Sequence, residues 1–376
     1  MTPNFIHLHT HTHYSMLSSP ILPAELFQKC LDLGMNAVAV TDHASLFNMP
    51  ELFSEAKKVS EKCGQPFKLI VGAELFIAPT SRHDKSTTEV HHLNVLVKNR
   101  IGYKNLCKIL SIAAREGFYY RPRADRETLF THAEGLICTT SCDRGELAKL
   151  VLRGDEAGAE AFIKAHKEVF GDDFYIELER HNAPEDARLN AHLIRLATKW
   201  DVKLVATNDV HYLEKKDAPI QEVMLAMKSK ATLSSSKRMK FPTDEFYLKS
   251  PEEMAALFDN SHNELSHTLE IAEKCEFHFK DSNPQLPLFK LPEGFKDDAD
   301  YLRYLTYQGA ARKYGDLDAL GERGKQIRER IEYELTTIAK MGFSSYFLIV
   351  SDLIAASRQQ GYSVMGLDGA RSQVAL

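Results

Sequence analysis

The chain has 376 residues, of which 44% are hydrophobic and 26% are charged, and its formal net charge at pH 7 is −5. This length exceeds one typical domain, so we expect a large domain and a smaller one. The charge balance excludes attraction to nucleic acid through net charge, so any polyanion site must be local. The sequence predicts no membrane span, no secretory leader and, from six cysteines without disulfide-like spacing, a cytoplasmic location.

Residues 5–13 read Phe-Ile-His-Leu-His-Thr-His-Thr-His and place four histidines at strict alternation. In an extended strand, alternate side chains share one face about 7 Å apart. The stretch therefore predicts a strand that presents His7, His9, His11 and His13 together, at a spacing that lets imidazoles converge on a metal. A solvated polar face or a cloned tag would explain them without a metal, but a tag would run as consecutive histidines.

Strand-like and helix-like segments alternate from this stretch to about residue 207. We expect strands at 37–41, 67–71, 93–97, 136–140, 174–178 and 203–207. We expect helices at 23–33 and 103–115, two between 143 and 170, and one at about 184–200. The first strand, helix and strand form a βαβ unit, which implies a parallel sheet. The alternation fits either a doubly wound sheet or a closed α/β barrel.

Metal-ligating side chains recur at or just past the predicted ends of several strands. They are Asp42, His43, Glu74, Cys142, Asp209 and His211, with His91 and His92 directly before another strand. Barrel enzymes collect their chemistry from several strand ends, whereas a doubly wound sheet concentrates it at one switch point. We therefore favour a barrel. Each residue alone has a structural explanation, such as a capping aspartate or a core thiol, but together they indicate a metal cluster.

The remaining third of the chain is organised differently. The basic, serine-rich segment 228–240 is either a phosphate-binding loop or, as we favour, a solvated surface connection. A proline-rich stretch precedes helices expected at 301–314, 325–340 and 343–359, and we interpret the apolar stripe of the last helix as core. The predicted division is a barrel at 1–280, a linker at 281–300 and a helical segment at 301–376.

Six short motifs carry a resemblance to a known family. They read Leu-His-Thr-His-Thr-His-Tyr-Ser at 8–15, Thr-Asp-His at 41–43, Gly-Ala-Glu at 72–74, His-Leu at 92–93, Ser-Cys at 141–142 and Asn-Asp-Val-His at 208–211. In this order they resemble the polymerase and histidinol phosphatase (PHP) family. Segments 246–254 and 340–350 also resemble the N-terminal part of bacterial DNA polymerase III alpha subunits, and the similarity covers about residues 4–364.

The resemblance implies a distorted seven-stranded (β/α) barrel with up to three divalent metals, followed by a helical segment like the start of the polymerase palm. The metals would be Zn or Mn, with Mg as a further option. The implied ligands are His9, His11, His43, Glu74, His92, Cys142, Asp209 and His211, among which His9, His11, Glu74 and Asp209 would hold the attacking water.

One implied ligand is missing. The family's ninth ligand is an aspartate, and Ser18 stands in its place. A serine hydroxyl is a poor metal ligand, so weaker binding of one metal is expected unless His13 compensates. The same resemblance assigns His7 and His13 to supporting or solvent-facing positions.

The implied function is in DNA replication, as a metal-dependent phosphoesterase and specifically a 3′-to-5′ exonuclease on single-stranded DNA or frayed 3′ ends. The first alternative is a non-catalytic replisome module that stabilises the polymerase or docks a proofreading exonuclease. The second is a small-molecule phosphatase or amidohydrolase, against which the polymerase-like segments argue. Residues 364–376 depart from the glycine-rich sequence that precedes the polymerase carboxylates in the family, so we expect no primer extension by this chain.

Overall fold

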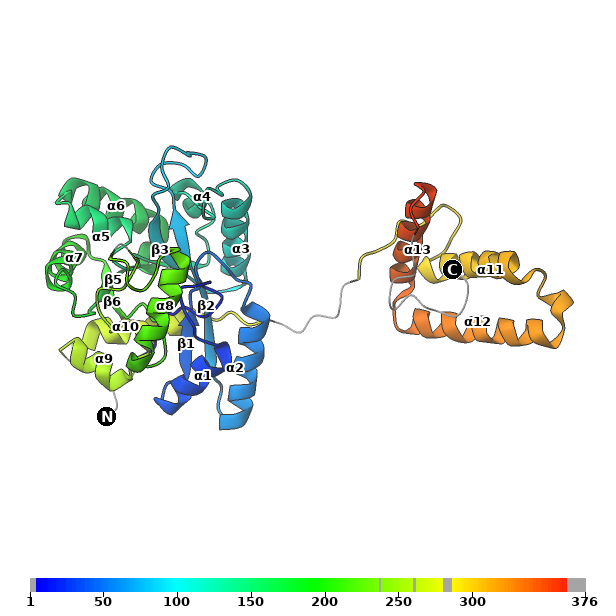
Figure 1. The fold of residues 1–376 in the computed structure, drawn as a ribbon, viewed down its shortest axis with the longest axis horizontal. Helices are drawn as coiled ribbons and strands as arrows, with labels where there is room; N and C mark the ends of the chain where they lie inside the picture. Colours follow the sequence, from blue (N-terminus) through cyan, green and yellow to red (C-terminus); the bar gives the residue numbers. More distant parts are fainter. Residues whose placement is uncertain (1–4, 237, 260–261, 280–285, 364–376) are drawn as a thin grey trace. The chain divides into compact units, whose positions relative to one another are not determined.

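The computed structural model describes residues 5–236, 238–259, 262–279 and 286–363. The chain divides into two compact units, unit 1 (Met1–Phe279) and unit 2 (Lys280–Leu376), and each is described by itself (Figure 1). The predicted departure from the family sequence at 364–376 lies outside the described residues.

Unit 1 is built on one six-stranded sheet whose strands follow each other in chain order. The strands are β1 (Ala37–Val40), β2 (Lys68–Ile77), β3 (His91–Val97), β4 (Leu136–Thr139), β5 (Phe174–Glu179) and β6 (Lys203–Thr207). The expected parallel pairing holds except at β3, which runs antiparallel to both β2 and β4. The described connection at 78–90 contains no helix, and a parallel pair needs a long crossover, usually a helix.

The histidine-rich segment is not the regular strand that its alternation predicts. Residues 5–11 hydrogen-bond to β1 on one side, where the Ala39 N–H donates to the His7 carbonyl at 2.8 Å. On the other side they meet the segment after β6, where Thr10 and Val210 form one isolated parallel bridge. The segment thus lies between the first and last strands of the curled sheet. Among the described residues the sheet has six strands, and the seventh is not confirmed because this segment forms only an isolated bridge and no continuous ladder.

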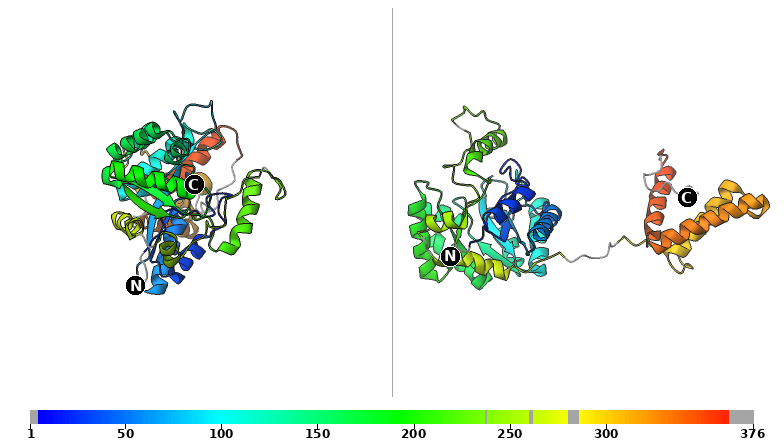
Figure 2. Two further views of the ribbon diagram at one scale, coloured as in Figure 1. Left: turned by 90° about the vertical axis from the view of Figure 1, so that its left-hand side faces the viewer. Right: turned by 90° about the horizontal axis from the view of Figure 1, so that it is seen from below.

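Helices surround the sheet in unit 1 (Figure 1). They are α1 (Pro23–Asp32), α2 (Met49–Cys63), α3 (Arg100–Arg115), α4 (Arg126–Thr131), α5 (Glu146–Leu152), α6 (Glu156–Phe170), α7 (Asp186–Trp200), α8 (Ala218–Lys228), α9 (Pro251–Leu257) and α10 (His262–Lys274). Five of these helices were not predicted from the sequence, namely α2, α4, α8, α9 and α10. Figure 2 shows α8 and the loop after it, in green, standing out from the rest of unit 1.

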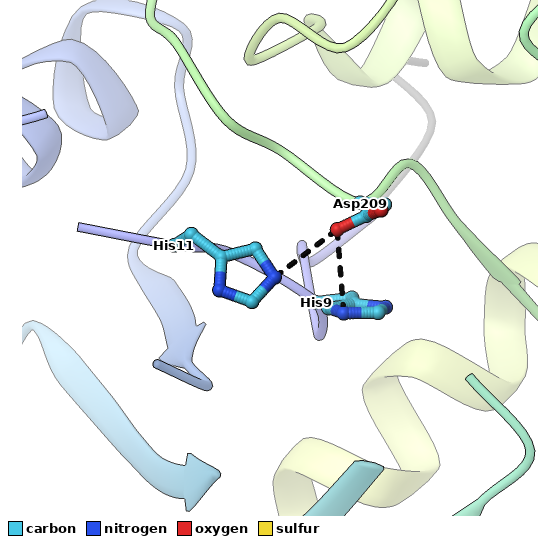
Figure 3. A group of neighbouring side chains, drawn as sticks. All are labelled: His9, His11 and Asp209. Atoms are coloured by element: carbon cyan, nitrogen blue, oxygen red, sulfur yellow. Dashed lines mark ion pairs between the residues drawn. The ribbon is translucent and has the colours of Figure 1, made fainter. Parts of the chain in front are cut away.

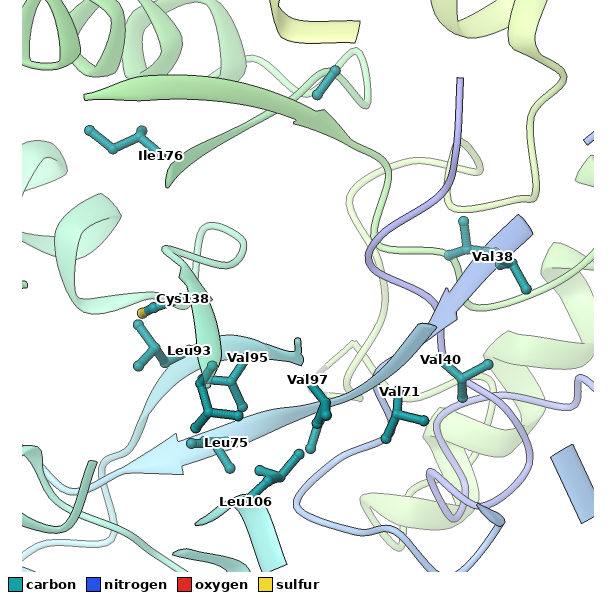
Figure 4. Packing of buried hydrophobic residues seen from close by; sticks show 14 of the residues in the cluster. Val38, Val40, Val71, Leu75, Leu93, Val95, Val97, Leu106, Cys138 and Ile176 are labelled. Carbon is teal, nitrogen blue, oxygen red and sulfur yellow. The ribbon is translucent and has the colours of Figure 1, made fainter. Parts of the chain in front are cut away.

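The two faces of the sheet bury different layers. One face packs Val38, Val40, Val71, Leu75, Leu93, Val95, Val97, Cys138 and Ile176 beneath the helices (Figure 4). The alternate residues, including Ala39, Ile70, Leu96, Ile137, Tyr175 and Val205, form a second cluster with Leu8 and Ile271. Farther along the strands, the side chains that point to the same face as this second cluster include Glu74, His92 and Glu177. Because side chains alternate along a strand, these polar groups lie on the inner face, above an apolar floor.

Shortening Ile176 to alanine is expected to lower the free energy of unfolding by about 3 kcal/mol, since a fully buried side chain leaves a cavity. Urea unfolding of unit 1 measures the change. Ile194→Ala on the exposed face of α7 is the matched control and should change stability by less than about 0.5 kcal/mol. Equal losses in both variants would contradict the packing described.

Unit 2 contains α11 (Asp298–Tyr314), α12 (Glu322–Lys340) and α13 (Ser344–Gln359). Leu302, Ile331, Leu335 and Leu348 belong to their shared core. The predicted apolar stripe of α13 is core only in part, because Val350 is buried whereas Leu353 is 57% exposed. Among the described helices none alone is long and apolar enough to cross a membrane. Only α12 and α13 taken together pass that test, and they are bent by 112°.

Candidate metal centre

All eight residues predicted as metal ligands meet at one end of the sheet in unit 1. The N-terminal segment supplies His9 and His11, β2 supplies Glu74, and β3 supplies His92. His43, Cys142, Asp209 and His211 follow the ends of β1, β4 and β6. Because β3 runs in the opposite direction, its first residues reach the same rim as the last residues of the parallel strands.

Asp209 is the meeting point of the first group of ligand atoms (Figure 3). Its Oδ1 lies 3.1 Å from His11 Nε2, 3.4 Å from His9 Nε2 and 3.2 Å from His211 Nε2. Donor atoms held about 2.1 Å from a tetrahedral metal lie roughly 3.4 Å from one another. The spacing therefore fits a metal ion shared by these side chains.

Glu74 joins two further groups. Its Oε2 lies 2.7 Å from His43 Nδ1, while its Oε1 lies 2.8 Å from His92 Nδ1 and 3.4 Å from His9 Nε2. Cys142 Sγ is 4.0 Å from the same Oε1. Burial, followed by the nearby carboxylates, raises the pKa of the Cys142 thiol well above its usual value. Cys142 would therefore need a metal to become the thiolate that ligates.

Five buried atoms of this cluster make no hydrogen bond of good geometry within the described structure, although each lies within 3.4 Å of another of the five. They are His9 Nε2, His11 Nε2, His43 Nδ1, Glu74 Oε2 and Asp209 Oδ1. A buried polar atom without a partner costs about 1–3 kcal/mol. Bound cations would satisfy all five together, so these residues fit a metal cluster.

A cavity of about 30 Å³ adjoins the cluster. It is lined by His43, Glu74, His92, Cys142, Asp143, Arg144, Asp209, His211, Phe241, Pro242 and Phe246. This volume is on the scale of one or two water molecules. A small reacting group therefore fits beside the ligands.

The two carboxylates are ionised at neutral pH. Burial alone would raise the pKa of Glu74, but the imidazoles of His92 and His43 hold it well below its usual value. The pKa of Asp209 is likewise held well below its usual value by its neighbouring imidazoles, against the effect of burial. Both groups therefore present the charged form that attracts a cation.

The histidines differ in protonation. Burial, followed by repulsion from His11, keeps the pKa of His43 well below its usual value. Burial, followed by repulsion from His211, also lowers the pKa of His11. Metals bind the neutral imidazole, so these two are prepared as ligands. Burial lowers the pKa of His9 too, but the carboxylates around it, led by Asp209, raise it well above its usual value.

Comparison with known proteins identifies the family. A model of the PHP domain matches residues 7–181, and a model of the bacterial DNA polymerase III alpha NTPase domain matches residues 300–375. The DNA polymerase III subunit alpha of Treponema pallidum is 38% identical over 366 residues, which cover 96% of this chain and 30% of that protein. The chain carries a PHP domain of the DNA polymerase III alpha type.

Two further comparisons show how far this similarity extends. The DNA polymerase III subunit alpha of Borreliella burgdorferi is 39% identical over 355 residues, which cover 93% of this chain and 30% of that protein. The chain thus spans about 30% of the length of these curated relatives. The solved structure of an amidohydrolase from Chromobacterium violaceum is 12% identical, with a TM-score of 0.33, and the match covers 56% of this chain and 88% of that one. A likeness this distant carries no argument about function.

Glu177 is a supporting residue of the PHP site that the sequence analysis missed. Its Oε2 accepts from His9 Nδ1 at 3.2 Å and from the Thr207 hydroxyl at 2.8 Å, while its Oε1 accepts from the Thr139 hydroxyl and the Ser141 N–H. A carboxylate behind a histidine fixes the tautomer that points Nε2 at a metal. The signal in the sequence is Glu-Leu-Glu at 177–179, which places two acids at alternate positions of an apolar strand.

Asp42 holds the PHP site together from outside the ligand cluster. Its Oδ1 accepts from the Ser15 hydroxyl at 2.6 Å, and Ser15 Oγ lies 3.1 Å from His11 Nδ1. The same carboxylate accepts from the Thr12 N–H at 2.7 Å. Asp42 therefore orients His11 through Ser15 and fixes the loop that follows it.

The other two alternating histidines lie outside the PHP ligand groups. His7 is fully buried and its Nε2 lies 2.9 Å from the Lys249 carbonyl, which excludes the solvent-facing one of its two predicted positions and leaves the supporting one. His13 Nδ1 lies 3.3 Å from the Ile21 carbonyl, and His13 joins none of the ligand groups among the described residues. These contacts give no support to the suggestion that His13 replaces the missing aspartate.

Proposed function

We propose that this chain is a metal-dependent phosphoesterase whose PHP site hydrolyses phosphodiester bonds during DNA replication. The observation that carries the proposal is a set of five buried ligand atoms that crowd together without hydrogen bonds of good geometry, on His9, His11, His43, Glu74 and Asp209. Divalent metals held there, Zn or Mn with Mg as a further option, supply an activated water and stabilise the attacking and leaving oxygens of a phosphoester.

Four overlapping groups have ligand atoms within 4.8 Å of one another, and three of them consist of predicted ligands. These three are His9 with His11 and Asp209, His11 with His43 and Glu74, and Glu74 with His92 and Cys142, while the fourth joins His9 to Glu177 and Glu179. In the proposal each of the three groups of predicted ligands holds one metal. His211, whose Nε2 lies 3.2 Å from Asp209 Oδ1, is a further ligand of the first group. Glu74 belongs to two groups, so its two oxygens would keep neighbouring metals close together.

The proposed substrate is DNA, cleaved from 3′ to 5′ at single-stranded or frayed ends. Similarity to DNA polymerase III alpha subunits along 93–96% of the chain supports this choice. We propose unit 1 as the phosphoesterase and unit 2 as part of the polymerase region. Other replisome subunits, such as a proofreading exonuclease, are the proposed protein partners.

The test is to strip the purified chain of metal, reload it with Zn or Mn, count the bound metal and add oligonucleotides labelled at the 3′ or the 5′ end. The expected result is at least two metals per chain and stepwise shortening from the 3′ end, with no shortening in chelator. Two bound metals with intact oligonucleotides would contradict catalysis.

A non-catalytic replisome module is the second candidate, and Ser18 is the observation that favours it. The Ser18 hydroxyl accepts a hydrogen bond from the Lys228 ammonium instead of offering a carboxylate. Fewer than two tightly bound metals in the same assay would favour this candidate over the phosphoesterase.

A further inference from the structure

Three cationic side chains from different segments surround the PHP site. Arg144 follows β4 and lines the cavity of about 30 Å³ beside the ligands. Its side chain is exposed, and no carboxylate lies within ion-pair distance of its guanidinium among the described residues. Arg144 therefore places a positive charge at the cavity without a direct ion pair. Loss of water around the guanidinium group lowers the pKa of Arg144, but Cys142 and the carboxylates of Asp143, Asp209 and Glu74 raise it above its usual value.

Arg121 approaches the same ligands from the connection before α4. Its guanidinium carbon lies 5.2 Å from the centre of the Phe76 ring. That ring in turn lies 5.2 Å from the ring of His92 and 5.5 Å from the ring of His43. Arg121 is thus one aromatic ring away from two proposed ligands, and it too forms no ion pair within the described structure.

Lys228 approaches from α8. Its side chain as a whole is exposed, but its ammonium group reaches a partly buried hydrogen bond with the Ser18 hydroxyl. The Ser18 carbonyl lies 2.7 Å from Nδ1 of His211. Lys228 is therefore connected to the ligand cluster through a single residue.

The three charges act on one another. Loss of water around the ammonium group, followed by repulsion from Arg121 and Arg144, lowers the pKa of Lys228 to about 8. Burial, followed by repulsion from Arg144, also lowers the pKa of Arg121. Arg126, which follows Arg121 closely in the chain, instead faces the Glu146 carboxylate at 2.7 Å. For Lys228 and Arg121 the loss of water and the repulsion outweigh the attraction of the Glu74 carboxylate. Cations in this state are stabilised when an anion binds beside them.

We propose that Arg121, Arg144 and Lys228 form a phosphate clamp that holds a backbone phosphate of a single nucleic-acid strand over the PHP site. The clamp rests on the proposed function, because it supplies the substrate contacts that the metal ligands do not make. The two guanidinium groups match phosphate oxygens with paired N–H donors, and the ammonium group adds a point charge. Tyr120, which is 76% exposed beside Arg121, offers a ring on which a base can stack.

Binding without metal separates this proposal from catalysis. The full chain is titrated in chelator against a 5′-fluorescein oligothymidylate, and anisotropy reports the affinity. Lys228→Met and Arg144→Gln should each weaken binding about tenfold, as expected for a charge-assisted contact. Each should also reduce the slope of log affinity against log salt by about 0.7, the value for one phosphate contact on a single strand. Lys228→Arg should retain most of the affinity.

The matched control is Lys164→Met, an exposed lysine on α6, which should bind as the unchanged chain does. Thermal melting confirms that each variant is folded. If Lys228→Met and Arg144→Gln bind the oligonucleotide as tightly as the control, the clamp is wrong. Inorganic phosphate, used as a competitor, shows which ligand the clamp recognises. If the variants weaken only oligonucleotide binding, the clamp recognises a nucleic-acid strand. If they weaken the binding of oligonucleotide and of inorganic phosphate equally, the clamp recognises any phosphate group. If the variants weaken binding as expected but the chain cuts no DNA, the phosphoesterase proposal is refuted and the clamp is not.

Discussion

Replacing Asp209 with asparagine is expected to lower DNA cleavage by about 10³-fold, because metal ions contribute several kcal/mol of transition-state stabilisation and about 1.4 kcal/mol corresponds to a factor of ten. The Asp209 Oδ1 lies 3.1 to 3.4 Å from three imidazole nitrogens, those of His9, His11 and His211. An amide has nearly the same shape but no charge, and its NH₂ group cannot bind a cation. At least one metal per chain should therefore be lost.

The fold should tolerate this change. Asp209 has a φ of 40°, and asparagine is among the few residues that adopt the left-handed region readily. Elemental analysis and the 3′-label assay measure the effect, with Asp172→Asn as an exposed control expected to match the unchanged chain. An Asp209→Asn variant that keeps its full metal content and its cleavage rate would remove Asp209 from the proposed site.

The ligand cluster could be predicted from sequence because each member is marked locally. His9 and His11 stand in a short alternating tract, and Asp209 and His211 follow a β-branched strand directly. Glu177 carries no such mark, since its role depends on hydrogen bonds from β4 and β6, about 30 to 38 residues away along the chain. Which side of a strand meets which neighbour is set by register, and a single sequence does not display register.

The fold, like the ligand cluster, could be predicted where its features are local in the sequence. Most helices and strands of unit 1 were expected near their observed bounds, because hydrophobic periodicity is a local property. The direction of β3 was not, since it is decided by the connection at 78–90. The N-terminal segment was predicted as a strand from its alternation alone, yet its partners lie 30 and 200 residues away, and it divides its hydrogen bonds between them.

Replacing Glu177 with alanine is expected to lower the free energy of unfolding by about 3–5 kcal/mol, the usual cost of removing one member of a buried charged pair. Four partners would lose their acceptor, among them His9 and the Thr139 and Thr207 hydroxyls. Glu177→Gln keeps the shape and most of these contacts, so it should remain folded. It should nevertheless bind metal about 10- to 100-fold more weakly, the usual effect of losing a carboxylate behind a metal-binding histidine.

Two effects of Glu177→Gln oppose each other, and charge decides between them. The carboxylate helps to raise the pKa of His9, so its removal makes the proton that competes with the metal easier to displace. The same carboxylate attracts a divalent metal about twice as strongly as it attracts the single charge of that proton, by Coulomb's law. The net result is therefore weaker metal binding, which titration with a zinc indicator at pH 7 measures. Glu168→Gln on the exposed face of α6 is the control.

The metal-free protein gives this prediction a pH signature. The pKa of Glu177 is lowered from its ordinary value of 4.5 in spite of burial, chiefly by His9, so its contribution to stability is present above pH 4.5 and is lost as the pH falls through the folded value. The pKa of His9 is raised from 6.5, so its contribution is full below pH 6.5 and is lost as the pH rises through the folded value. The stability difference between the unchanged chain and Glu177→Gln should therefore be greatest between pH 4.5 and 6.5. Urea unfolding in chelator at pH 4, 5.5 and 9 tests this, and a difference that is the same at all three would show that Glu177 and His9 are not a charged pair.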